Sequence, residues 1–136
     1  MTMLRTLSVA TLALGLAACA AGSPAPRPGE FPLRSSDQPP FTVSWRLAEA
    51  PESVKADGVL DIGGYADRLQ DATVELVGLD AGGRVVSRGI DLLVPRAFAG
   101  DRLWPFRLQL TPTGREARFA VRVAEFNWKI EPFAGR

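Results

Sequence analysis

The chain has 136 residues, which is room for one domain of ordinary size. Its 16 basic and 15 acidic residues leave a formal net charge of +1, so no charge excess points to nucleic acid as a partner. It has no histidine and a single cysteine, which excludes histidine-based nucleophile systems, imidazole metal ligands and an intramolecular disulfide. We therefore expect a domain stabilised by packing alone, with no cofactor, no metal site and no catalytic residues.

The N-terminal segment has the pattern of an export signal. A basic start, 1–5, precedes the apolar run 6–16, which has the length of a signal-peptide core and is too short to span a bilayer. The next residues, LAAC at 16–19, resemble the bacterial lipobox, in which a leucine and two small residues precede a lipid-modified cysteine. The resemblance implies cleavage after Ala18 and a lipid on Cys19 that anchors the mature protein to a membrane.

The segment after the cysteine has the composition of a spacer. Residues 20–40 are rich in Pro, Ala, Gly and Ser, which favours an extended linker. We interpret Phe31 and Leu33 within it as isolated apolar residues, with docking on the domain as the alternative. Ala20 in place of an aspartate implies, by the same resemblance, sorting to the outer membrane with the domain facing the periplasm. The predicted divisions are a signal peptide over 1–18, a lipid-anchored linker over 19–40 and a folded domain over 41–136.

From Phe41 onward apolar and polar side chains alternate, which is typical of strands with one buried face. Predicted strands cover 41–47, 54–62, 72–79, 84–94, 104–110 and 119–130. Pro105 cannot donate to a ladder, so its strand is predicted either to lie at a sheet edge or to begin after this proline. The parity of the apolar residues changes after Val123, which indicates a bulge or a crossing between sheets. About six or seven short strands fit an all-β fold, a small antiparallel immunoglobulin-like sandwich, with an open barrel as the alternative.

The central stretch, roughly 59–128, contains Gly64-Tyr65 and the segments ATVELVGL, LDAGGRVVSRGI and WPFRLQL. With this pattern it resembles the FxLYD-type β-sandwich domain of bacterial exported proteins. The family's usual asparagine after the second strand is absent from IGGYADRL. The resemblance implies a binding or spacer module without catalytic residues. A similarity of LQDATVEL and PFRLQL to pilotin-like lipoproteins implies a chaperone for an outer-membrane assembly instead.

Tryptophans and arginines are the candidates for a binding surface. Trp104 is next to the edge-marking proline, and we expect it to be more exposed than Trp45, where it would present an aromatic platform to a glycan or partner strand. Arg118 and Arg122 share a strand face at even spacing, and Arg88 can join them as a site for an anionic ligand. The alternative is an ordinary outer face of salt-bridged charges.

Acidic residues give weaker signals. Asp57 and Asp61, with two further aspartates nearby, lack the spacing and the glycine of a calcium loop, which favours solvated charges. Asp101 and Glu116 flank turns, where carboxylates ordinarily bind backbone N–H groups. We therefore expect a non-enzymatic envelope lipoprotein whose domain binds or positions an envelope protein or the cell wall. The alternatives are the pilotin-like chaperone and an envelope hydrolase, the latter disfavoured by the missing histidine and nucleophile.

Overall fold

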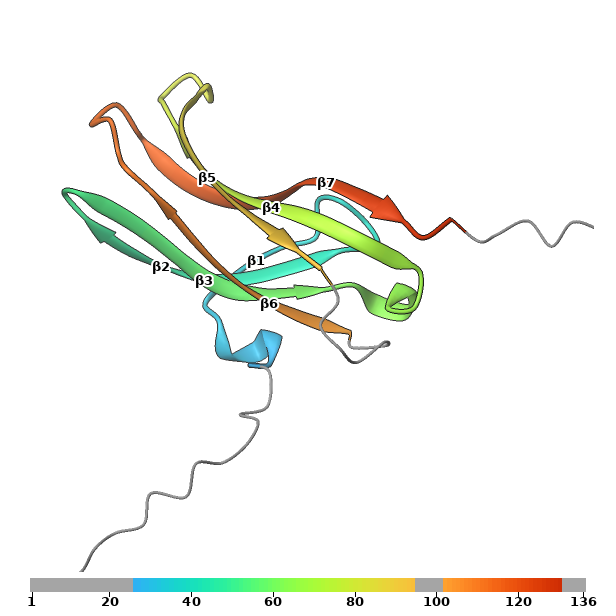
Figure 1. Cartoon of the computed structure of the whole chain (residues 1–136). Helices are drawn as coiled ribbons and strands as arrows, with labels where there is room; N and C mark the ends of the chain where they lie inside the picture. The colour runs from blue at the N-terminus through green and yellow to red at the C-terminus, as the bar shows by residue number, and fades with distance from the viewer. Residues whose placement is uncertain (1–25, 95–101, 131–136) are drawn as a thin grey trace, which may run out of the picture.

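A computed structural model describes residues 26–94 and 102–130 of the chain (Figure 1). The predicted signal peptide, Ala18, Cys19 and Asp101 lie outside the described residues. The described part contains two single-turn 3-10 helices, η1 (Pro28–Glu30) and η2 (Gly63–Tyr65). Its strands are β1 (Leu33–Ser35), β2 (Thr42–Ala50), β3 (Ser53–Asp61), β4 (Leu69–Leu79), β5 (Val85–Leu93), β6 (Leu103–Leu110) and β7 (Arg118–Trp128). No helix in these residues has the length and apolarity to cross a bilayer.

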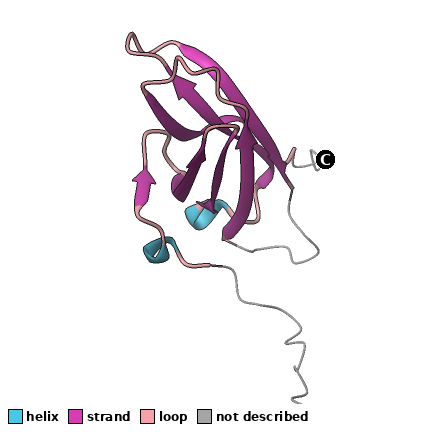
Figure 2. Ribbon diagram, turned by 90° about the vertical axis from the view of Figure 1, so that its left-hand side faces the viewer, coloured by secondary structure: helices cyan, strands magenta, loops and turns pink. Residues whose placement is uncertain are grey.

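The strands form two antiparallel sheets that pack face to face (Figures 1 and 2). One sheet has the order β1-β2-β3-β6 and the other β5-β4-β7. This confirms the predicted all-β sandwich and decides against the barrel. The strand order differs from that of an immunoglobulin constant domain, because there the second and third strands lie in different sheets, whereas here β2 and β3 form a hairpin in one sheet.

The core lies between the sheets and follows the predicted alternation. In β6, Trp104, Phe106, Leu108 and Leu110 are buried, while the residues between them are exposed. Among the largest fully buried side chains are Phe41, Leu60, Ile62, Leu69 and Leu76. Their burial removes apolar surface from water, which is the main stabilising contribution in a domain of this kind.

A bulge in β7 explains the change of parity in the last strand. Val74 of β4 is opposite Val123, whereas Thr73 is opposite Glu125, so Ala124 is the extra residue. The shift turns the side chains after it, so that Phe126 can contact the buried ring of Phe41. Of the two predicted causes, a bulge and a crossing between sheets, the structure shows the bulge.

The predicted end of the linker at residue 40 is wrong, because its second half belongs to the domain. Backbone pairing joins Leu33 to Trp45 and Ser35 to Val43, which makes β1 an edge strand. The Arg46 guanidinium lies 5.2 Å from the ring centroid of Phe31. Composition missed this because a strand of three residues is too short for a period-two pattern to be seen.

Candidate binding face

The outer face of the β5-β4-β7 sheet gathers the predicted arginines. Val74 and Leu76 of β4 point into the core, so Glu75 between them points outward. Residues opposite each other in an antiparallel pair share a face. The register places Ile90 of β5 and Arg122 of β7 on either side of Glu75. Arg88 of β5 is opposite Val77, two residues further along β4 and therefore on the same face.

Glu75 binds both guanidinium groups. Its Oε1 accepts from Arg122 Nε at 2.5 Å, and its Oε2 lies 2.9 Å from Arg88 Nε. The Glu75 residue is 4% exposed, although it points away from the core, because the flanking side chains cover it. Charge and strand parity predicted that Arg88 and Arg122 share a face, but they did not single out Glu75. The signal for Glu75 was a single carboxylate in the otherwise apolar run VELV.

The two arginine side chains remain about half exposed. Two cations on one carboxylate leave a net positive charge, and within the described residues neither guanidinium has an ion-pair partner besides Glu75. Because each uses its Nε on Glu75, the Nη groups are the donors that a ligand would meet. Arg118 lies on the same face opposite Leu79, four residues before Arg122 on the same strand, and does not join the pair.

Apolar side chains adjoin the charged group along β5. Ile90, opposite Glu75, is 67% exposed, and Leu92, opposite Thr73, is also exposed. We call Glu75, Arg88, Ile90, Leu92 and Arg122 the arginine face. Exposed apolar groups beside paired arginines are typical of interaction surfaces, in which arginine is enriched.

The prediction that Trp104 is more exposed than Trp45 is wrong, because both residues are 6% exposed. The strand β6 is an edge strand, as Pro105 indicated, but an edge leaves backbone groups unpaired and does not change which face a side chain occupies. Trp104 faces the core, packs in the main apolar cluster and is no part of the arginine face.

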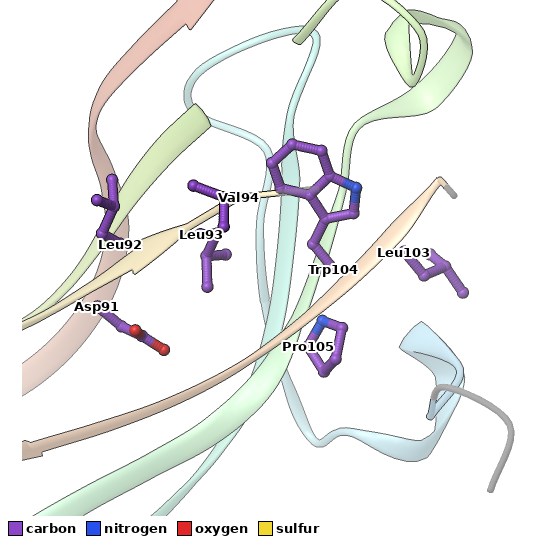
Figure 3. Close-up of a pocket in the computed structure, with 7 residues that line it drawn as sticks. All are labelled: Asp91, Leu92, Leu93, Val94, Leu103, Trp104 and Pro105. Carbon is purple, nitrogen blue, oxygen red and sulfur yellow. The ribbon is translucent and has the colours of Figure 1, made fainter. Parts of the chain in front are cut away.

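Trp104 instead forms one wall of a shallow pocket of about 200 Å³ between the end of β5 and the start of β6 (Figure 3). The pocket is lined by Asp91, Leu92, Leu93, Val94, Leu103, Trp104 and Pro105. The Asp91 carboxylate at its side accepts from the backbone N–H of Arg107 at 3.4 Å. Its small volume and open shape suit one side chain of a partner better than a small-molecule substrate.

The remaining acidic candidates have local partners. Asp61 receives the Arg102 guanidinium at 2.7 and 3.1 Å, and Asp57 lies 3.7 Å from the Arg46 Nε. Partial burial would by itself raise the pKa of Asp61, but Arg102 and the Gly63 N–H hold it below its ordinary value. Across 26–94 and 102–130, no group of acidic or cysteine side chains is arranged to hold a metal ion.

Glu116 has the turn role predicted for it. Its carboxylate accepts from the backbone N–H groups of Thr113 at 2.6 Å and Gly114 at 2.9 Å. The Thr113 N–H bond is the main cause that lowers the pKa of Glu116 to about 2. This carboxylate therefore holds the loop between β6 and β7.

Family models, curated proteins and solved structures compared with this chain contain no match to it. The arginine face is the place in the described structure where charge, apolar exposure and fixed geometry coincide. Its guanidinium groups are donors of the kind that bind an anionic group.

Proposed function

We propose that this protein is a non-enzymatic lipoprotein of the bacterial cell envelope, and that its sandwich binds an anionic envelope component through the arginine face. The observation that carries the proposal is Glu75, which holds the guanidiniums of Arg88 and Arg122 side by side while leaving both half exposed. A carboxylate that restricts two arginines reduces the conformational entropy they lose on binding. Ile90 beside them adds apolar contact area.

The ligand chemistry follows from the donors. Guanidinium Nη groups match the spacing of carboxylate and phosphate oxygens and bind them with charge-assisted hydrogen bonds. Peptidoglycan carboxylates, lipopolysaccharide phosphates and acidic side chains of envelope proteins all present such groups. The partner is therefore an acidic envelope protein or an acidic cell-wall component.

The location part of the proposal is supported by the sequence. The lipobox-like LAAC supports cleavage after Ala18 and lipid attachment at Cys19, and Ala20 supports residence at the outer membrane with the domain in the periplasm. The resemblance of 59–128 to FxLYD-type domains supports a binding or positioning module.

A site-specific crosslink tests the binding role. A photoreactive residue in place of Ile90 should give an adduct with the anionic partner in intact cells. The double change Arg88→Gln and Arg122→Gln should reduce that adduct at least about tenfold, since a hydrogen bond to a charged group contributes about 1.5–3 kcal/mol. Arg115→Gln, which removes an exposed arginine in the β6–β7 turn, is the matched control and should leave the adduct unchanged. An adduct that survives the double change would contradict the proposal.

Lipid labelling tests the anchor. Cys19→Ser should abolish incorporation of radiolabelled palmitate and release the protein from the membrane fraction. Palmitate that persists on the Cys19→Ser protein would show that the lipid is elsewhere, and would remove the lipobox assignment without affecting the arginine face.

A further inference from the structure

Four aromatic rings gather at one end of the sandwich, where β7 ends and η2 connects β3 to β4. Phe126 lies edge-on to Phe41 with ring centroids 5.0 Å apart, and Trp128 stacks on Phe41 at 6.2 Å. Tyr65 and Phe126 each approach Trp128 to 5.5 Å. Phe41 is buried beneath Phe126 and Trp128, so it supports a cluster whose outer members face solvent.

The outer members are more exposed than the aromatic residues of the core. Tyr65, Phe126 and Trp128 are between 39% and 43% exposed, and Ile130 beyond them is 89% exposed. We call these four residues the aromatic end. Ala72 of β4 is opposite Phe126 on one side and Leu93 on the other, so Leu92 and Val94, both exposed, lie at the same end. The apolar surface thus extends over both edges of the three-stranded sheet.

Charges at this end are mixed. The backbone N–H of Lys129 donates to the Arg68 carbonyl at 2.7 Å, which brings two exposed cationic residues beside the rings. Asp67 and Glu125 are exposed nearby, and Asp71 accepts from the Asn127 side chain at 2.7 Å. Because these two cations and three carboxylates leave no net positive charge, apolar area and not net charge is the main contribution this end can make to a contact.

The length of chain before the domain determines how far the domain can lie from its anchor. The described fold begins at η1 with Pro28, so 20–27 is what separates it from Cys19, in place of the predicted spacer 20–40. In the extended polyproline II form, at about 3.1 Å per residue, these eight residues span about 25 Å. The longest strands, β4 and β7, have 11 residues each and measure about 36 Å at about 3.3 Å per residue. The tether is therefore shorter than the sandwich it holds.

We infer that the aromatic end contacts the surface of the bilayer that holds the anchor, with Tyr65 and Trp128 at the level of the lipid headgroups and Phe126 and Ile130 among the first acyl carbons. The inference rests on the proposed lipid at Cys19. Trp and Tyr have an apolar body and a polar N–H or O–H, which is why they concentrate at membrane interfaces. Lys129 and Arg68 can extend their charged groups to the phosphates while their stems stay apolar. The arginine face would then be presented sideways from the membrane.

Quenching by brominated lipids tests this contact in the intact lipidated protein. The mature protein is reconstituted into phosphatidylcholine and phosphatidylglycerol vesicles whose acyl chains are brominated near the glycerol. Trp45 and Trp104 are buried in the core, so the expected quenching comes from Trp128 and is lost in the Trp128→Phe variant. A protein that floats with the vesicles while its Trp128 emission is unchanged by bromine would overturn the inference and leave the anchor intact.

A tryptophan at the opposite end is the matched control. Glu52 is exposed in the turn between β2 and β3, and Glu52→Trp in the Trp128→Phe background should remain unquenched. Equal quenching at both positions would mean that the domain has no preferred orientation, which also overturns the inference. A mature protein that does not float with vesicles would instead contradict the anchor, and the membrane contact that rests on it.

Discussion

The two ends of the sandwich differ in the contacts that stabilise the connections between strands. At the end opposite the aromatic rings, short turns join β2 to β3, β4 to β5 and β6 to β7 (Figure 1). Asp80 Oδ1 accepts from the N–H groups of Gly82 and Arg84 at 2.9 Å each, and Glu116 binds its own turn in the same way. We call this the turn end. The Asp80 and Glu116 carboxylates accept hydrogen bonds from backbone N–H groups of their own turns, as is ordinary for such residues.

The aromatic end has ring contacts in place of turns closed by carboxylates. Residues 62–68, which include η2, link β3 to β4, while 36–41 link β1 to β2. Apolar side chains at this end stay exposed after folding, whereas the Asp80 and Glu116 carboxylates at the turn end accept from backbone N–H groups. The turn end is thus stabilised by its own hydrogen bonds, whereas the aromatic end keeps apolar surface exposed, and this is the surface that the proposed membrane contact would cover.

The largest expected loss of stability is at Phe41, the buried ring beneath the aromatic end. Phe41→Ala should lower the free energy of unfolding by about 3–5 kcal/mol, because it removes a fully buried ring and leaves a cavity under two others. Phe126→Ala, which truncates a half-exposed ring, should cost clearly less. Urea denaturation of both variants measures the difference. Equal losses would show that the exposed rings are part of the core after all.

The next largest difference in stability is expected between alanine substitutions of one glycine at each end. A Cβ on Gly78 would overlap Ser87 Oγ and come within 2.5 Å of Glu116 Cγ, so Gly78→Ala should destabilise the protein by about 1–3 kcal/mol. Gly64 in η2 has nothing within 4 Å of such a Cβ, and Gly64→Ala should change the urea midpoint little. A Gly64→Ala protein as unstable as Gly78→Ala would contradict the open space around Gly64.

Acidification should weaken the turn end through Glu116. Its pKa of about 2 in the folded protein is below its ordinary value of 4.5, so it stabilises the fold above about pH 4.5 and loses this effect as the pH falls toward 2. Urea midpoints at pH 7 and pH 3 should differ less for Glu116→Gln than for the unchanged protein. Some decline should remain in the variant, because the pKa of Asp61 is lowered as well. A variant with the full decline would show that Glu116 does not contribute.

The smallest expected change in stability is at Ile130. It is almost fully exposed, so Ile130→Ser should alter the free energy of unfolding by no more than about 0.5 kcal/mol. The same change should nevertheless reduce the bromolipid quenching of Trp128, since it removes apolar contact with the membrane. A large loss of stability would mean that Ile130 packs on the domain and is not free for the bilayer.

Local pattern in the sequence determined most of the strands. Six of them follow from period-two alternation. The change of parity between Val123 and Phe126 indicated a bulge or a crossing between sheets, and the structure shows the bulge at Ala124. Turns such as 80–84 follow from glycine and aspartate. These features need only neighbouring residues, because alternation and turn chemistry act over a few positions of the chain.

Tertiary structure decided which residues of neighbouring strands lie opposite each other. Glu75 and Arg122 are 47 positions apart, and their contact depends on the register between β4 and β7, which no local pattern encodes. The sequence identified Arg88 and Arg122 by their charge and parity, but it could not show that a carboxylate holds them together. The short strand β1 pairs with β2 through backbone hydrogen bonds. Such bonds do not depend on side-chain composition, so composition did not predict this strand. Trp104 was misjudged because the position of a strand at an edge and the face its side chain occupies are separate properties, and only the packing of the second sheet shows which face is buried.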